Sequence, residues 1–87
     1  MRFTQNDVQQ YLTLVSDDNP IHDTIVPGQL VMDTFIAQNG WDYSRMSVRY
    51  KRSICIGEVV HLVAREDGYY HIVNEENEVK IELNLIF

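Results

Sequence analysis

The sequence predicts an α+β protein in which an antiparallel sheet curls around one apolar helix. Two helical patterns come first, the period of the apolar residues changes to two from Ser44 onward, and short turns separate the later segments. Helices followed by a run of neighbouring strands are typical of the α+β class. With 87 residues and no linker or repeat, the chain is expected to form a single domain over residues 1–87.

The first helix is predicted at about Gln5 to Val15. Thr4 and Asp7 have the spacing of a capping box, with aspartate in place of glutamate. The helix is expected to end in the polar run before Pro20, because a residue that precedes proline disfavours helical backbone. Apolar residues at the spacing i, i+3, i+4, i+7 form one stripe of this helix: Val8, Tyr11, Leu12 and Val15.

A second, strongly apolar helix is predicted from Gly28 to Gln38. Asn39-Gly40 marks its end, because glycine readily adopts the left-handed conformation that closes many helices. A helix that is apolar around most of its circumference is buried on nearly all sides. We therefore expect this helix to lie at the centre of the fold. Its apolar residues are Leu30, Val31, Met32, Phe35, Ile36 and Ala37.

Four strands are predicted after the second helix, because alternating apolar and polar residues are typical of strands that bury one face. Asp67-Gly68 is predicted to form a hairpin turn. Within the last strand, Lys80, Glu82, Asn84 and Ile86 alternate with the apolar residues and are expected on the opposite face. The four segments are Ser44 to Lys51, Glu58 to Glu66, Tyr69 to Asn74 and Val79 to Phe87.

Charge and composition argue against several classes of protein. A net charge of −6 argues against nucleic acid as the main partner. The single cysteine, Cys55, rules out an internal disulfide and a cysteine-based zinc site, and no metal site is predicted. No apolar run approaches the ~20 residues that cross a membrane, and the N-terminus lacks the apolar stretch of a signal peptide. A cytoplasmic protein without a membrane partner is therefore expected.

One segment combines groups that could carry out chemistry. Asp17 and His22 lie five residues apart on either side of the Asn19-Pro20 turn, and Gly28 then opens the second helix. A carboxylate, an imidazole and a helix N-terminus are the groups needed to hold a water and polarise a carbonyl. Alternatively, the residues before Pro20 simply end a helix and form a turn.

Three motifs occur in an order that resembles MaoC-like dehydratases and (R)-specific enoyl-CoA hydratases. The first runs from Phe3-Thr4-x-x-Asp7-Val8 into Asp17-x-Asn19-Pro20-x-His22. The second is Ile25-Val26-Pro27-Gly28-x-Leu30. The third extends over residues 48–60 as Val48-x-Tyr50-Lys51-Arg52-Ser53-Ile54-x-Ile56-Gly57-Glu58-x-Val60. The resemblance implies a hotdog fold, in which the sheet wraps the central helix, and a shortened member, because only Asp23 to Val26 separate His22 from the Pro27-Gly28 helix start.

The same resemblance implies roles for the residues of the motif. Asp17 and His22 would bind and activate the water that adds to the double bond of an enoyl thioester. Asn19 and Pro20 would order the turn between them. The backbone N–H at Gly28 would bind the thioester oxygen as it gains enolate charge. The substrate would be an acyl thioester of coenzyme A or of an acyl carrier, with no further cofactor.

Other residues have alternative interpretations. Asp33, five positions after Gly28, either lies near Asp17 and raises its proton affinity or points away toward Arg49 or a subunit interface. The basic residues Arg49, Lys51 and Arg52 either bind the phosphates of coenzyme A or form a solvated strand face.

Three functions are consistent with the sequence. The leading prediction is a homodimer or higher homo-oligomer that hydrates a 2-enoyl thioester or dehydrates a 3-hydroxyacyl thioester. A hotdog thioesterase would use a carboxylate to activate water against the thioester carbonyl. An inactive member would bind an acyl thioester or serve as a subunit of a larger complex.

Overall fold

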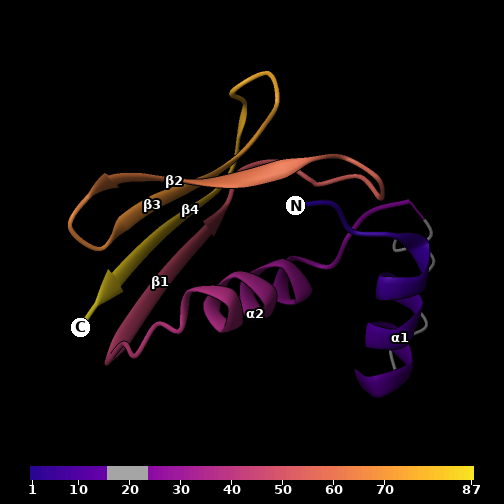
Figure 1. The fold of residues 1–87 in the computed structure, drawn as a ribbon, viewed down its shortest axis with the longest axis horizontal. Coiled ribbons are helices and arrows are strands. Elements are labelled where there is room, and N and C mark those ends of the chain that lie inside the picture. The colour runs from indigo at the N-terminus through magenta and orange to yellow at the C-terminus, as the bar shows by residue number, and fades with distance from the viewer. Residues whose placement is uncertain (16–23) are drawn as a thin grey trace.

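The computed structural model describes residues 1–15 and 24–87. Within these residues, four antiparallel strands form one sheet in the order β1-β4-β3-β2. Helix α2 lies along one face of this sheet, and α1 lies beyond the N-terminal end of α2 (Figure 1). The elements are α1 (Gln5–Val15), α2 (Gly28–Asn39), β1 (Arg45–Tyr50), β2 (Val60–Glu66), β3 (Tyr69–Asn74) and β4 (Val79–Ile86).

Helix α1 begins with the predicted capping box. The Thr4 backbone N–H donates to Asp7 Oδ2 at 2.9 Å, and the Asp7 N–H donates to Thr4 Oγ1 at 3.1 Å. These reciprocal bonds satisfy N–H groups that the first turn of a helix leaves free. The apolar stripe then buries Val8 and Leu12. The bounds predicted for this helix are confirmed.

The core lies between α2 and the inner face of the sheet. Strand register places apolar residues opposite one another, so that Val48 pairs with Leu83 and Ile72 pairs with Ile81. Such cross-strand pairs stabilise a sheet when one face is buried. Val31, Met32 and Phe35 of α2 pack into the same cluster. The alternation predicted for the strands therefore specifies the buried face.

Burial of α2 differs from the prediction. Val31, Met32 and Phe35 are buried, whereas Gln29, Asp33 and other residues on the opposite side of α2 are exposed. The expectation that the helix is buried on nearly all sides is wrong for the single chain. The sheet has two faces and α2 packs on one of them, so the other side of the helix receives no cover from the strands.

Lys80 is a second departure from the prediction. It belongs to the polar face of β4, yet only 6% of its surface is exposed. Its ammonium is surrounded by Glu58, Glu78 and the carbonyl oxygen of Ser53. Alternation alone cannot predict this burial, because the covering groups come from turns outside β4.

The N-terminal residues extend the sheet beyond β2. Arg2 forms an isolated antiparallel bridge with Val59. The Met1 ammonium donates to Val60 O and the Val60 N–H donates back to Met1 O, both at 2.8 Å. The Gly57 N–H donates to Phe3 O at 2.9 Å. The short segment before α1 therefore fixes the position of that helix beside the sheet.

The turn between β2 and β3 requires glycine. Gly68 has a φ of 74°, in the left-handed region that side chains disfavour. A Cβ at this position would also overlap the carbonyl oxygen of Leu85. The predicted Asp67-Gly68 turn is thus confirmed, and its glycine allows the hairpin to lie close to β4.

Among the described residues, no helix is long and apolar enough to cross a membrane.

Candidate active site

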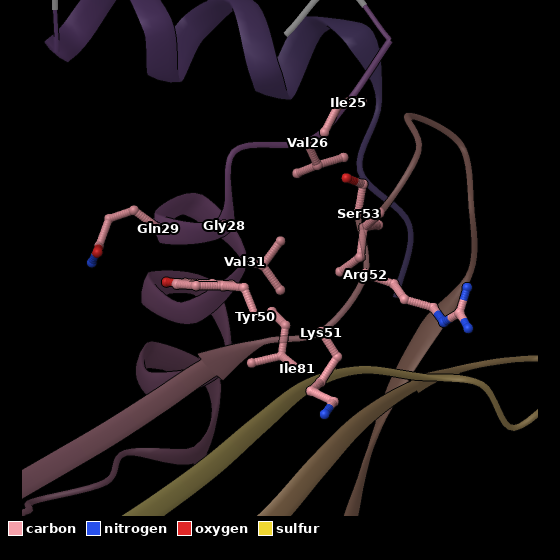
Figure 2. Close-up of a pocket in the computed structure, with 11 residues that line it drawn as sticks. Ile25, Val26, Gly28, Gln29, Val31, Tyr50, Lys51, Arg52, Ser53 and Ile81 are labelled. Carbon is pink, nitrogen blue, oxygen red and sulfur yellow. The ribbon is translucent and has the colours of Figure 1, made fainter. Parts of the chain in front are cut away.

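A cavity of about 400 Å³ opens between the first turn of α2, the end of β1 and the segment that follows β1 (Figure 2). Its apolar wall is formed by core residues, and polar groups gather at its rim. The residues that line it are Ile25, Val26, Gly28, Gln29, Val31, Tyr50, Lys51, Arg52, Ser53, Ile54 and Ile81. A cavity of this size suits a small organic ligand.

Backbone hydrogen bonds hold the two walls of the cavity together. Ile25 forms an isolated antiparallel bridge with Cys55. The Val26 N–H donates to Ile54 O at 2.8 Å, and the Ile56 N–H donates to Thr24 O at 2.9 Å. The residues before α2 are therefore fixed against the chain after β1, although they are far apart in sequence.

The N-terminus of α2 lies at the cavity. Pro27 precedes the helix with φ −59° and ψ 130°, and its side chain provides no capping hydrogen bond. The first N–H groups of a helix have no partner within the helix, and the helix dipole favours negative charge at this end. The Gly28 N–H is one of these groups. The opening of α2 can therefore bind an oxygen that gains negative charge.

Tyr50 covers this opening from the end of β1. A Cβ on Gly28 would lie 2.5 Å from Tyr50 Cε1, so the absence of a side chain on Gly28 allows the ring to approach the helix. Burial raises the pKa of Tyr50, and the charges of Asp33 and Tyr11 raise it further. The phenol stays protonated at neutral pH. Tyr50 is 53% exposed, so it also faces solvent.

Asp33 lies on the exposed side of α2 and is not among the residues that line the cavity. Its Oδ1 accepts a hydrogen bond from Gln29 Nε2 at 2.7 Å. This is an (i, i+4) contact along the helix surface. Asp33 is close enough to Tyr50 to influence its pKa. A role as modulator of the site stays a prediction.

Lys51 and Arg52, which follow β1, line the cavity with their aliphatic stems. Their charged ends point away from it (Figure 2). Lys51 Nζ lies 3.6 Å from Glu82 Oε1, and Arg52 Nε lies 3.5 Å from Glu78 Oε2. These ion pairs are partly exposed, and such pairs contribute only ~0.2–1 kcal/mol. Both side chains could therefore exchange their carboxylate for a ligand phosphate.

Arg49 does not belong to this rim. It lies within β1, opposite Glu82 in the strand register, and does not line the cavity. Of the three basic residues predicted to contact phosphates, the structure brings Lys51 and Arg52 to the cavity together with Gly28.

A polar cluster around the buried residues Lys80 and Asn74 supports the rim, and the sequence analysis did not predict it. Lys80 Nζ lies 3.2 Å from Glu58 Oε2 and 3.0 Å from Glu78 Oε1, and donates to Ser53 O at 2.9 Å. Asn74 Nδ2 donates to Glu58 Oε2 at 3.1 Å. Glu78 and Lys80 are two residues apart and share one face at the start of β4, but Glu58 lies far from both in sequence, so no local spacing indicates that the three meet.

Contacts within this cluster favour the charged forms of Lys80 and Glu58. Burial alone would lower the pKa of Lys80, but its bonds to Glu78 and Glu58 raise the pKa above 10.5. Burial alone would raise the pKa of Glu58, but hydrogen bonds from the Cys55 N–H, Asn74 and Lys80 lower it below 4.5. The contribution of Lys80 to stability is thus present below pH 10.5 and is lost at higher pH.

The predicted catalytic pair, Asp17 and His22, and the residues of its supporting turn, Asn19 and Pro20, lie outside the described residues. Their roles stay predictions. They precede, in the sequence, the segment from Thr24 to Gly28 that leads to the cavity.

Comparison with known proteins confirms the fold. No family model and no curated protein match the chain. Among solved structures, the chain is similar to the (R)-hydratase from A. caviae involved in PHA biosynthesis, with a TM-score of 0.73 and 20% sequence identity. The similarity covers 98% of this chain and 86% of that chain. The predicted hotdog fold and the resemblance to (R)-hydratases are thus confirmed at the level of the fold.

Acid titration should reveal the charged cluster. A carboxylate whose pKa is lowered in the folded state stabilises the protein above its unfolded pKa, and this contribution is lost as the pH falls through the folded pKa. We expect the free energy of unfolding of the wild type to fall more steeply below about pH 4.5 than that of Glu58→Gln. Urea unfolding at a series of pH values measures both. Parallel curves would contradict the assignment of a lowered pKa to Glu58.

Proposed function

We propose that this protein is a hydro-lyase that adds water to a 2-enoyl thioester or removes it from a 3-hydroxyacyl thioester. The observation that carries the proposal is the opening of α2 at Gly28, which lines a cavity of about 400 Å³ together with Lys51 and Arg52. Structural similarity to an (R)-hydratase supports the same class of reaction. The sequence also supplies a carboxylate and an imidazole, Asp17 and His22, shortly before this helix.

The proposed reaction uses these groups in one addition. One member of the Asp17–His22 pair takes a proton from water as the hydroxyl oxygen bonds to C3 of the substrate. The electrons of the double bond move toward the thioester, and the enolate oxygen is stabilised by the Gly28 N–H. The other member delivers a proton to C2, which completes the addition of one water. Dehydration is the reverse.

The cavity has surfaces for both ends of such a substrate. Val26, Val31, Ile54 and Ile81 provide apolar surface for an acyl chain. Lys51 and Arg52 provide cations for the phosphate groups of coenzyme A or of an acyl carrier. The thioester would then lie between them, at Gly28.

A homodimer forms part of the proposal. Among the described strands, β1 pairs only with β4, so one edge of the sheet is open. Ile86 and Phe87, at the end of β4, are 52% and 63% exposed. A second chain would cover both features.

Sedimentation equilibrium should give twice the chain mass of 10.2 kDa, and a mass of one chain at micromolar concentration would contradict the dimer.

Activity and its dependence on the predicted pair can be measured with crotonyl-CoA. Hydration removes the enoyl absorbance, and we expect the wild type to catalyse this loss. Asp17→Asn and His22→Ala should each lower kcat by ~10²–10⁴, the usual contribution of general acid–base catalysis. Matched controls are Asp42→Asn and His61→Ala, which change exposed residues away from the cavity and should retain activity.

Three outcomes would contradict the proposal. Absence of hydration by the wild type would remove the activity, and unchanged rates in both variants would remove the predicted pair. Release of free thiol from acyl-CoA, without hydration, would identify a thioesterase instead.

A further inference from the structure

Lys80 is buried at the back of the cavity rim and has an acceptor for each of its donors. Its ammonium contacts Glu58 and Glu78 and donates to the carbonyl oxygen of Ser53, at 2.9–3.2 Å. A buried ammonium is costly unless it is paired and hydrogen-bonded. Ser53 lines the cavity, so the charge of Lys80 is connected directly to the cavity wall.

The backbone of Lys80 binds the two residues that precede Ser53. Its carbonyl oxygen accepts hydrogen bonds from the Lys51 N–H at 2.8 Å and from the Arg52 N–H at 3.1 Å. Three successive rim residues, 51–53, therefore bind to one residue of β4. The side chain fixes the last of the three and the backbone fixes the first two.

The carboxylates around Lys80 are themselves held in place. Asn74, which is 8% exposed, donates through Nδ2 to Glu58 Oε2 at 3.1 Å. Its Oδ1 accepts the backbone N–H of Glu78 at 2.9 Å. Glu58 Oε1 accepts the N–H of Cys55 at 3.0 Å. The cluster thus joins the chain after β1, at Ser53 and Cys55, to the turn after β3.

The cluster leaves the rim cations free to change partner. Arg52 pairs with Glu78, which also pairs with Lys80. Lys51 pairs with Glu82, which also accepts the Tyr69 hydroxyl at 3.3 Å. When Arg52 or Lys51 turns toward an anionic ligand, neither carboxylate loses its last donor. The loss of a last partner is the costly event for such groups.

We propose that Lys80 is a positioning residue, which fixes the 51–53 segment so that Lys51 and Arg52 can bind the phosphate groups of a ligand in the cavity. Lys80 does not touch the ligand. That the ligand is a coenzyme A thioester rests on the proposed function, whereas the positioning of the segment does not.

Hydrogen exchange tests the positioning without any ligand. The test variant is Lys80→Met, and the matched control is Lys51→Met, since these are the two lysines of the chain. Lys80→Met keeps the backbone carbonyl that accepts the Lys51 and Arg52 N–H groups, so faster exchange of these groups would report loosening of the segment after loss of the side-chain bond to Ser53 O. We expect their exchange to accelerate by about tenfold or more, because that lost bond is a charged hydrogen bond. Exchange within β2 and β3 should stay near that of the wild type. Lys51→Met should leave the Arg52 N–H protected.

Ligand binding separates positioning from a general structural role. Coenzyme A and pantetheine share the thiol arm, but pantetheine lacks phosphates. Calorimetric titration should show that Lys80→Met weakens binding of coenzyme A by about tenfold, the loss of roughly one charged contact, and leaves pantetheine unchanged. An equal loss for both probes would indicate a merely structural role and overturn the proposal.

The remaining outcomes are also decisive. Wild-type protection of Lys51 and Arg52 in Lys80→Met would overturn the positioning. If exchange accelerates but the wild type binds no coenzyme A, the phosphate part of the proposal fails, and with it the coenzyme A substrate of the proposed function. If Lys80→Met does not fold, Glu58→Gln serves in its place, and unchanged exchange at residues 51–53 would then contradict the proposal.

Discussion

The packing of α2 against the inner face of the sheet is the constraint on which the rest of the structure depends. Val31, Met32 and Phe35 pack against the apolar residues of the strands. This contact fixes the orientation of the helix and its position along the sheet. As a result, the N-terminus of α2 meets the end of β1, where Tyr50 lies against Gly28. The cavity is a consequence of the core, because its apolar wall consists of core residues.

Much of the fold follows from local patterns. The capping box at Thr4, the glycine after α2 and the Asp67-Gly68 turn each involve residues adjacent in sequence, and each occurs as predicted. Features that depend on distant residues could not be predicted in this way. The burial of Lys80 requires Glu58 and Glu78 to meet it from other elements, and the cover of α2 depends on the extent of the sheet.

The candidate site likewise combines features that the sequence predicted with features that depend on tertiary contacts. The sequence pointed to Gly28, Lys51 and Arg52, and the structure places all three at one cavity. The sequence did not indicate that Lys51 and Arg52 are already paired with carboxylates, nor that Tyr50 covers the helix opening. Those contacts arise from tertiary packing across several strands. The roles of Asp17 and His22 still rest on the resemblance of their motif.

In the proposed reaction, the Gly28 N–H stabilises the oxygen of the reacting thioester. The most direct measurement compares the hydration of crotonyl-CoA by Gly28→Pro and Gly28→Ala. Both substitutions place a Cβ against the Tyr50 ring, but only proline removes the N–H, and proline is well tolerated at the first position of a helix. We expect kcat of the proline variant to be ~10²–10³ lower than that of the alanine variant, as for the loss of one oxyanion donor. Equal rates in two folded variants would contradict the claim.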